Sequence, residues 1–136
     1  MTTIKSKYLG GLRTEATHIK SGNTVITDAP PDNNGKGEAF SPSDLVCAAL
    51  GSCMMTIMGI LAEREGIDLT SVEFETTKVM TASPRKISEI LIEFDLTGVV
   101  ATEAQKEKLK RAAHTCPVAL SLHPDIKQEV TFRFAT

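Results

Sequence analysis

The feature that most limits the fold is the stretch 45–62, in which apolar or small residues occupy nearly every face of a helix. Ser41 is a good N-cap, Pro42 suits the first helical position, and Asp44 stands where a capping box has its acid. Gly66 is a suitable left-handed residue for the end of the helix. A helix that is apolar all round has to be surrounded by other structure. We therefore expect either the rest of the chain or a second subunit to cover it.

Composition and charge limit the class of protein. The 136 residues carry 15 Lys and Arg against 17 Asp and Glu, a formal charge of −2, which argues against a nucleic-acid binder with a clustered basic face. With 41% hydrophobic and 24% charged residues, the chain is expected to be a single globular domain, 1–136. The first ten residues have no signal-peptide pattern, and Gly and polar residues interrupt the longest apolar run. We expect no membrane span and a cytoplasmic location.

The remaining hydrophobic patterns predict an α+β fold without internal repeats. Residues 102–105 form a second capping box, Thr-x-x-Gln, at the start of an amphipathic helix. The segment 29–39 is rich in Pro, Gly and Asn, and a loop of this length within a small domain is often functional. The elements expected besides the apolar helix are short strands within 2–28, a hairpin of strands at 72–76 and 87–96, helices at 102–114 and 118–122, and a strand at 126–134.

Three cysteines are too few, and odd in number, for a secreted disulfide scaffold. Cys53, within the apolar helix, is either a core residue or a reactive thiol that needs a cation from elsewhere in the fold. Cys116 precedes Pro117, so it either caps a short helix, where N–H groups favour a thiolate, or merely precedes a turn. About 9 Å of rise and about 120° of rotation separate Cys47 from Cys53 on the helix, which rules out a disulfide between them. Cys47 is interpreted as a packing residue.

Other chemistries find little support in the sequence. His114, Cys116 and Cys53 lack the paired spacing of a zinc site, so no metal is expected. The glycines at 10–11 and 35–37 lack the following Lys and the helix that a phosphate-binding loop requires. A serine nucleophile in a G-x-S-x-G turn is absent.

Two cysteine-containing blocks together resemble a known family. Phe-Ser-Pro-Ser-Asp-Leu at 40–45 leads into Ala-Ala-Leu-Gly-Ser-Cys at 48–53, and Cys-Pro-Val-x-x-Ser-Leu follows at 116–122. Gly-Gly-Leu-Arg at 10–13 and Thr-Asp-Ala-Pro at 27–30 fit as well. The chain resembles the OsmC/Ohr superfamily (osmotically inducible protein C and organic hydroperoxide resistance proteins), in its OsmC-like branch, over essentially its whole length.

The resemblance implies an intertwined homodimer, with β-sheets wrapped around central cysteine-bearing helices. It implies thiol-dependent reduction of organic and inorganic hydroperoxides, without a cofactor and with an external dithiol or dithiol protein as reductant. Cys53 matches the peroxidatic cysteine and Cys116 the resolving one, and Arg13 lies near the place of the arginine that holds the thiolate. The neighbouring methionines, Met54 among them, would suit an apolar hydroperoxide, although such residues more often fill a core.

One position departs from the family pattern. The hydroperoxide-resistance branch has a glutamate ten residues before the peroxidatic cysteine, where this chain has Ser43. Asp44 either replaces that acid or caps the helix, and capping is favoured. Arg13 is therefore expected to be less firmly positioned than in the family. Two alternatives to a peroxidase remain open: a binding protein for a small lipophilic or thiol ligand, and a structural dimer whose cysteines are core residues.

Overall fold

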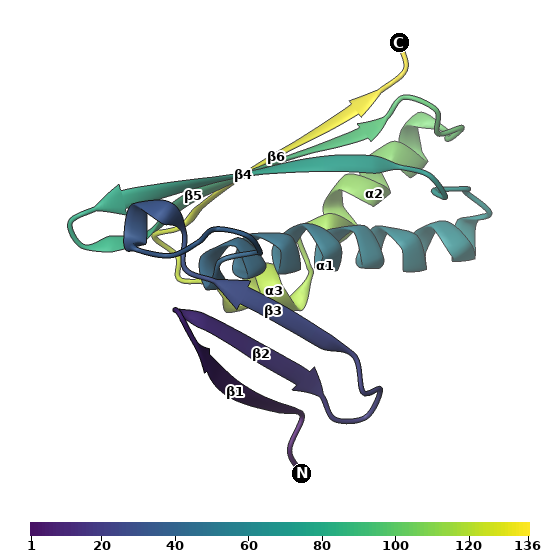
Figure 1. Ribbon diagram of the computed structural model, residues 1–136. Helices are drawn as coiled ribbons and strands as arrows, with labels where there is room; N and C mark the ends of the chain where they lie inside the picture. Colours follow the sequence, from purple (N-terminus) through teal and green to yellow (C-terminus); the bar gives the residue numbers. More distant parts are fainter. The chain divides into compact units, whose positions relative to one another are not determined.

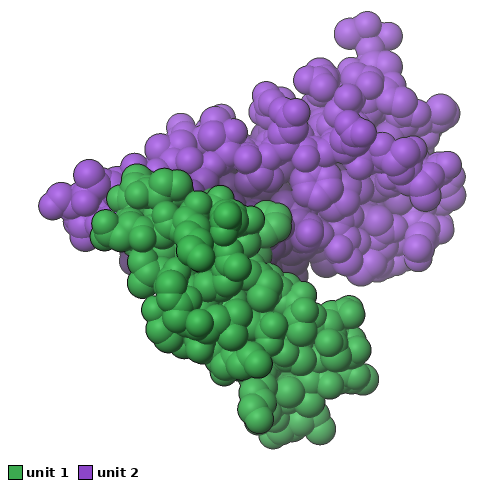
Figure 2. Space-filling model, in the orientation of Figure 1, with its two compact units in different colours: residues 1–46 green, residues 47–136 purple.

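The strands β1 (Ile4–Gly10), β2 (Arg13–His18) and β3 (Thr24–Asp28) form an antiparallel sheet in the order β1-β2-β3. The computed structural model describes all residues, 1–136, and divides them into two compact units, 1–46 and 47–136 (Figures 1 and 2). The first unit contains this sheet. The short strands predicted within 2–28 are confirmed.

The loop after β3 is ordered by its own backbone. It contains the short 3-10 helix η1 (Pro31–Asn33), and the N–H of Gly37 donates to the carbonyl of Ala29 at 3.1 Å. A side chain on Gly35 would collide with the backbone of Ala29, since its Cβ would lie 1.8 Å from the carbonyl oxygen. The loop predicted at 29–39 is therefore a folded turn that requires glycine at position 35.

Helix α1 (Pro42–Glu65) begins and ends as the sequence predicts. The Ser41 Oγ accepts from the N–H of Asp44 at 3.0 Å, and the Asp44 carboxylate accepts from the N–H of Ser41 at 2.9 Å, which is the reciprocal pattern of a capping box. At the other end, Gly66 has a φ of +71°, and the N–H of Ile67 donates to the Ala62 carbonyl at 2.8 Å.

Within one chain, α1 is covered on one face. The buried positions recur every three or four residues, as on one stripe of a helix: Cys47, Leu50, Gly51, Met54, Met58 and Ala62. Positions on other faces are exposed, and they include Ala49, Ser52, Thr56 and Ile60. The rest of the chain, which was one of the two expected ways of covering α1, thus covers only part of the helix surface.

The apolar character of α1 also bears on the membrane prediction. By length and composition alone, α1 is long and apolar enough to cross a membrane, so the exclusion drawn from its interrupting Gly and polar residues is wrong as stated. Core helices of water-soluble proteins meet the same criterion, and α1 packs one face into a core. This single helix is therefore weak support for a membrane protein.

The second unit is built on a three-stranded sheet with the order β4-β5-β6. Strands β4 (Glu73–Ala82) and β5 (Arg85–Leu96) are antiparallel, which confirms the predicted hairpin. Strand β6 (Lys127–Phe134) runs parallel to β5, so the chain has to cross over between them. The crossover contains α2 (Glu103–Ala113) and α3 (Pro117–Ser121). Both predicted helices and the last strand are confirmed, as is the α+β class.

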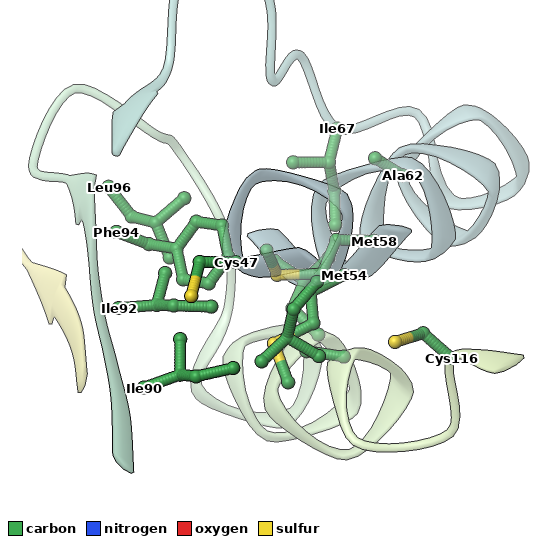
Figure 3. Packing of buried hydrophobic residues seen from close by; sticks show 13 residues of the cluster. Cys47, Met54, Met58, Ala62, Ile67, Ile90, Ile92, Phe94, Leu96 and Cys116 are labelled. Carbon is green, nitrogen blue, oxygen red and sulfur yellow. The ribbon is translucent and has the colours of Figure 1, made fainter. Parts of the chain in front are cut away.

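The core of this unit lies between α1 and the sheet (Figure 3). Phe94 on β5 lies between Phe74 and Phe132 of the neighbouring strands, with ring centroids 5.2 and 5.5 Å away. Gly51 lets α1 approach β4 closely, because a Cβ there would lie 3.0 Å from the ring of Phe74. Gly51 thus serves close packing of the helix on the sheet.

Candidate active site

Two of the three thiols meet in the second unit. Cys53 lies on α1, and Cys116 is the N-cap of α3, more than sixty positions away in the sequence. Both are free thiols, and they lie close enough for Cys53 to raise the pKa of Cys116. Cys53 is half-buried, whereas Cys116 has no exposed surface. The fold therefore produces an adjacent dithiol in which one sulfur is more accessible than the other.

The surroundings of Cys116 favour the protonated thiol. Burial raises the pKa of Cys116, and the neighbouring Cys53 raises it further. The backbone N–H of Ala119, which donates to Sγ at 3.3 Å, acts in the opposite direction. Cys116 does cap a helix, as predicted, and the N–H groups there favour the thiolate, but burial has the larger effect and the pKa is raised.

Cys47 has a different environment. It is 3% exposed and belongs to the hydrophobic core, on the same buried stripe of α1 as Met54 (Figure 3). Its interpretation as a packing residue is confirmed. The site in the second unit consequently contains two thiols, and the third serves the core.

Arg13 is held by two carboxylates in the first unit. Its Nε and Nη2 donate to the two carboxylate oxygens of Asp28 at 2.7 and 2.8 Å, a bidentate pair, and Nη2 also donates to Glu38 at 2.9 Å. The expectation that Arg13 is loosely positioned without an acid at position 43 is therefore wrong. Acids from β3 and from the following loop supply the contacts.

The sheet register explains why Asp28 meets Arg13. The two residues stand opposite each other in the β2–β3 ladder, so their side chains emerge on the same face. Asp28 is 1% exposed and also accepts from the N–H of Glu38 at 3.1 Å. The hydrogen bond from Arg13 lowers the pKa of Asp28, and Asp28 in turn raises the pKa of Arg13. Both groups are therefore charged over the whole physiological range.

Sequence reasoning did not identify Asp28 and Glu38 as site residues. Asp28 was within the Thr-Asp-Ala-Pro block that carried the resemblance, and Glu38 was within the loop considered functional. The capping role expected for Asp44 is confirmed. Arg13 belongs to the unit 1–46 and the two thiols to the unit 47–136. No group of three or more His, Cys, Asp or Glu side chains is placed to hold a metal ion.

Comparison with known proteins identifies the family of the chain. A family model for OsmC-like proteins matches residues 35–131, which include both site cysteines. The chain belongs to the OsmC/Ohr superfamily. A crystal structure from Psychrobacter arcticus 273-4, provisionally named an osmotic stress induced and detoxification response protein, is 48% identical, with a TM-score of 0.92 over 98% of this chain and 96% of that one.

More distant structures share the fold. An organic hydroperoxide resistance protein OsmC from Legionella pneumophila is 19% identical, with a TM-score of 0.74 over 97% of each chain. The organic hydroperoxide resistance protein OhrB of Bacillus subtilis is 18% identical, with a TM-score of 0.62 over 97% of this chain and 98% of that one. No curated protein matches the sequence. The family is thus linked to osmotic stress and to hydroperoxide resistance.

Proposed function

We propose that this protein is a thiol-dependent peroxidase that reduces organic hydroperoxides, and inorganic ones by the same chemistry. The observation that carries the proposal is the adjacent pair of free thiols, Cys53 and Cys116, with the first partly accessible and the second buried. A peroxidatic sulfur has to be accessible to the substrate, and a resolving sulfur has to lie close to the sulfenic acid that forms on it. Family membership supports the same assignment.

The reaction takes two steps at the pair. The Cys53 thiolate attacks the distal peroxide oxygen, the O–O bond breaks, the leaving oxygen takes a proton as alcohol or water, and Cys53 becomes a sulfenic acid. The Cys116 sulfur then attacks the Cys53 sulfur, water leaves, and a disulfide forms. An external dithiol or dithiol protein reduces that disulfide, so no cofactor is required.

The different surroundings of the thiols suit these roles. Cys116 is buried beside Cys53 and has no exposed surface. Its raised pKa keeps Cys116 itself from competing for the oxidant. Arg13, by its resemblance to the family arginine, is proposed to stabilise the Cys53 thiolate and the departing oxygen.

A homodimer is part of the proposal. The exposed face of α1 carries small and apolar residues, among them Ala49 and Ile60. The first unit buries no hydrophobic side chain and exposes Tyr8, Leu12 and Phe40. Surfaces of this kind usually lie against a partner. Together with family membership, they support a second copy as that partner. We also propose a cytoplasmic location, because the proposed thiol chemistry needs a compartment in which cysteines stay reduced.

Peroxide-dependent loss of free thiols tests the activity. Cumene hydroperoxide should remove two thiols per wild-type chain, none in Cys53→Ser, and one in Cys116→Ser, where a sulfenic acid is trapped. Cys47→Ser is the matched control on the same helix and should again lose two. An unchanged thiol count in the wild type would overturn the proposal. Thermal stabilisation by a lipophilic or thiol ligand under those conditions would instead favour a binding protein.

Sedimentation at micromolar concentration tests the assembly. The expected mass is twice that of the chain. A stable monomer across the concentration range would contradict the homodimer while leaving the thiol chemistry to its own test.

A further inference from the structure

We propose that Asp28 and Glu38 are positioning residues, which together hold the guanidinium of Arg13 in one orientation. They replace the carboxylate that the hydroperoxide-resistance branch has at the position of Ser43. This inference rests on the proposed function, because it assigns these acids to the arginine proposed to serve Cys53. Neither acid lies on α1. Asp28 comes from the end of β3 and Glu38 from the loop that follows it.

Three hydrogen bonds fix the plane of the guanidinium. Nε and Nη2 lie against the two oxygens of Asp28, and Nη2 reaches Glu38 as well. A bidentate pair defines the orientation of both planar groups, which a single contact does not. These contacts use Nε and Nη2, so the two N–H groups of Nη1 stay available for another acceptor, such as a thiolate or a peroxide oxygen.

The loop is built to bring Glu38 to this place. The backbone N–H of Glu38 donates to Asp28, and the N–H of Asp28 donates to the carbonyl of Phe40 at 3.0 Å. A bridge between Thr27 and Phe40 continues the contact beyond β3. Because Gly35 and the turn around it close the loop, Glu38 returns to the strand that carries Asp28. Asp28 thus organises the backbone of the loop as well as the guanidinium.

The two acids differ in exposure, and the difference predicts a ranking. Asp28 is 1% exposed and makes two of the three contacts, whereas the side chain of Glu38 is 65% exposed. Loss of the buried acid should release the guanidinium more completely than loss of the exposed one. Asp28 is therefore the main positioning residue, and Glu38 the second.

Charge and positioning predict opposite signs, which makes a decisive test possible. Each acid carries a negative charge, so removing it would favour a nearby thiolate if charge alone mattered. If the acids position Arg13, their removal disfavours the thiolate instead. Asp28→Asn and Glu38→Gln keep the size of each side chain and remove its charge, so the direction of the effect separates the two cases.

The experiment measures the reactivity of Cys53 without peroxide. In a Cys47→Ser, Cys116→Ser background, the rate of alkylation by iodoacetamide is followed against pH. Glu38→Gln should slow alkylation at neutral pH by roughly 3- to 10-fold and Asp28→Asn by roughly 10- to 100-fold, because the rate follows the fraction of thiolate. Both should move the pH of half-maximal rate upward. Glu15→Gln, on β2 and ion-paired only with Lys7 at 3.6 Å, is the matched control and should leave the profile unchanged.

The outcomes separate this inference from the proposed function. Profiles equal to the parent, or faster alkylation in either variant, would overturn the positioning roles even if the wild type loses two thiols to peroxide. If the wild type is inert to peroxide but both variants move the profile upward, the positioning roles stand and the peroxidase proposal fails. Should Asp28→Asn fail to fold, the variants at position 38 decide whether the acids position Arg13, because that exposed side chain does not support the fold. Glu38→Gln should slow alkylation, and Glu38→Asp, which keeps the charge, should restore part of the rate.

Discussion

The interiors of the two units are stabilised by different interactions (Figure 2). In 47–136 the buried side chains are hydrophobic, thiols included, and most of them come from α1, β5 and α2. In 1–46 the buried residues are polar, namely Thr27, Asp28 and Ser41, while strand β1 is exposed along its whole length. The first unit therefore depends on charge and hydrogen bonding, and the second on apolar packing.

This difference matches the parts that the proposed chemistry needs. A guanidinium has to be oriented, which fixed carboxylates and a hydrogen-bonded loop do well. A resolving thiol has to be kept protonated and dry until its partner is oxidised, which an aliphatic core does well. Each unit thus has the interior that suits the role proposed for its own residue.

The largest effect is expected from the core of the second unit. Phe94→Ala removes the middle of three neighbouring rings on the sheet and should lower the free energy of unfolding by about 3–5 kcal/mol. Urea denaturation measures it. Val100→Ala, at a position 90% exposed, is the control and should change stability little. A small loss in Phe94→Ala would mean that apolar packing does not dominate this unit.

The next effect should be confined to the first unit. Arg13→Met leaves the buried carboxylate of Asp28 without its ion pair, and a buried unpaired charge destabilises its surroundings. Amide hydrogen exchange over 24–40 should become faster by roughly tenfold or more, while protection in β5 stays as it was. Lys7→Met removes only an exposed ion pair and is the control. Equal loosening of both units would contradict the contrast between them.

Acid should affect the first unit before the second. Because Arg13 lowers the pKa of Asp28, the stabilisation is present above the ordinary value of 3.8 and is lost as pH falls through the lower, folded value. NMR spectra recorded from pH 6 downward should show the amides of 24–40 losing their native positions first. In Asp28→Asn this step should be absent. A first loss in the core of 47–136 would reverse the predicted order.

The smallest effect is expected at alkaline pH in the second unit. Burial raises the pKa of Cys116 above its ordinary 9.0, so the native state holds the proton more tightly than the unfolded chain. That stabilisation is complete below 9.0 and is lost as pH rises through the folded value. The difference in Tm between wild type and Cys116→Ala should therefore shrink between pH 8 and pH 10.5. A constant difference would show that burial does not hold the thiol protonated.

Local features of the sequence predicted much of the fold. The caps at Ser41 and Thr102, Gly66, and the alternation in β5 and β6 placed most elements, because these signals depend on neighbours a few positions apart. Coverage of α1 was less predictable. Its apolar faces indicated that something surrounds it, while only the structure shows which stripe the chain itself covers.

By itself the sequence determined the kinds of element, their order, and the three thiols among which a reactive pair could be sought. Only the tertiary structure decided that Cys53 and Cys116 lie close together and that burial outweighs the helix cap at Cys116. It also decided that Arg13 pairs with two acids that lie outside α1. The physical reason is range. Caps and periodicity act over one or two turns, whereas strand register, loop closure and desolvation depend on residues that are distant in the chain and meet only after folding.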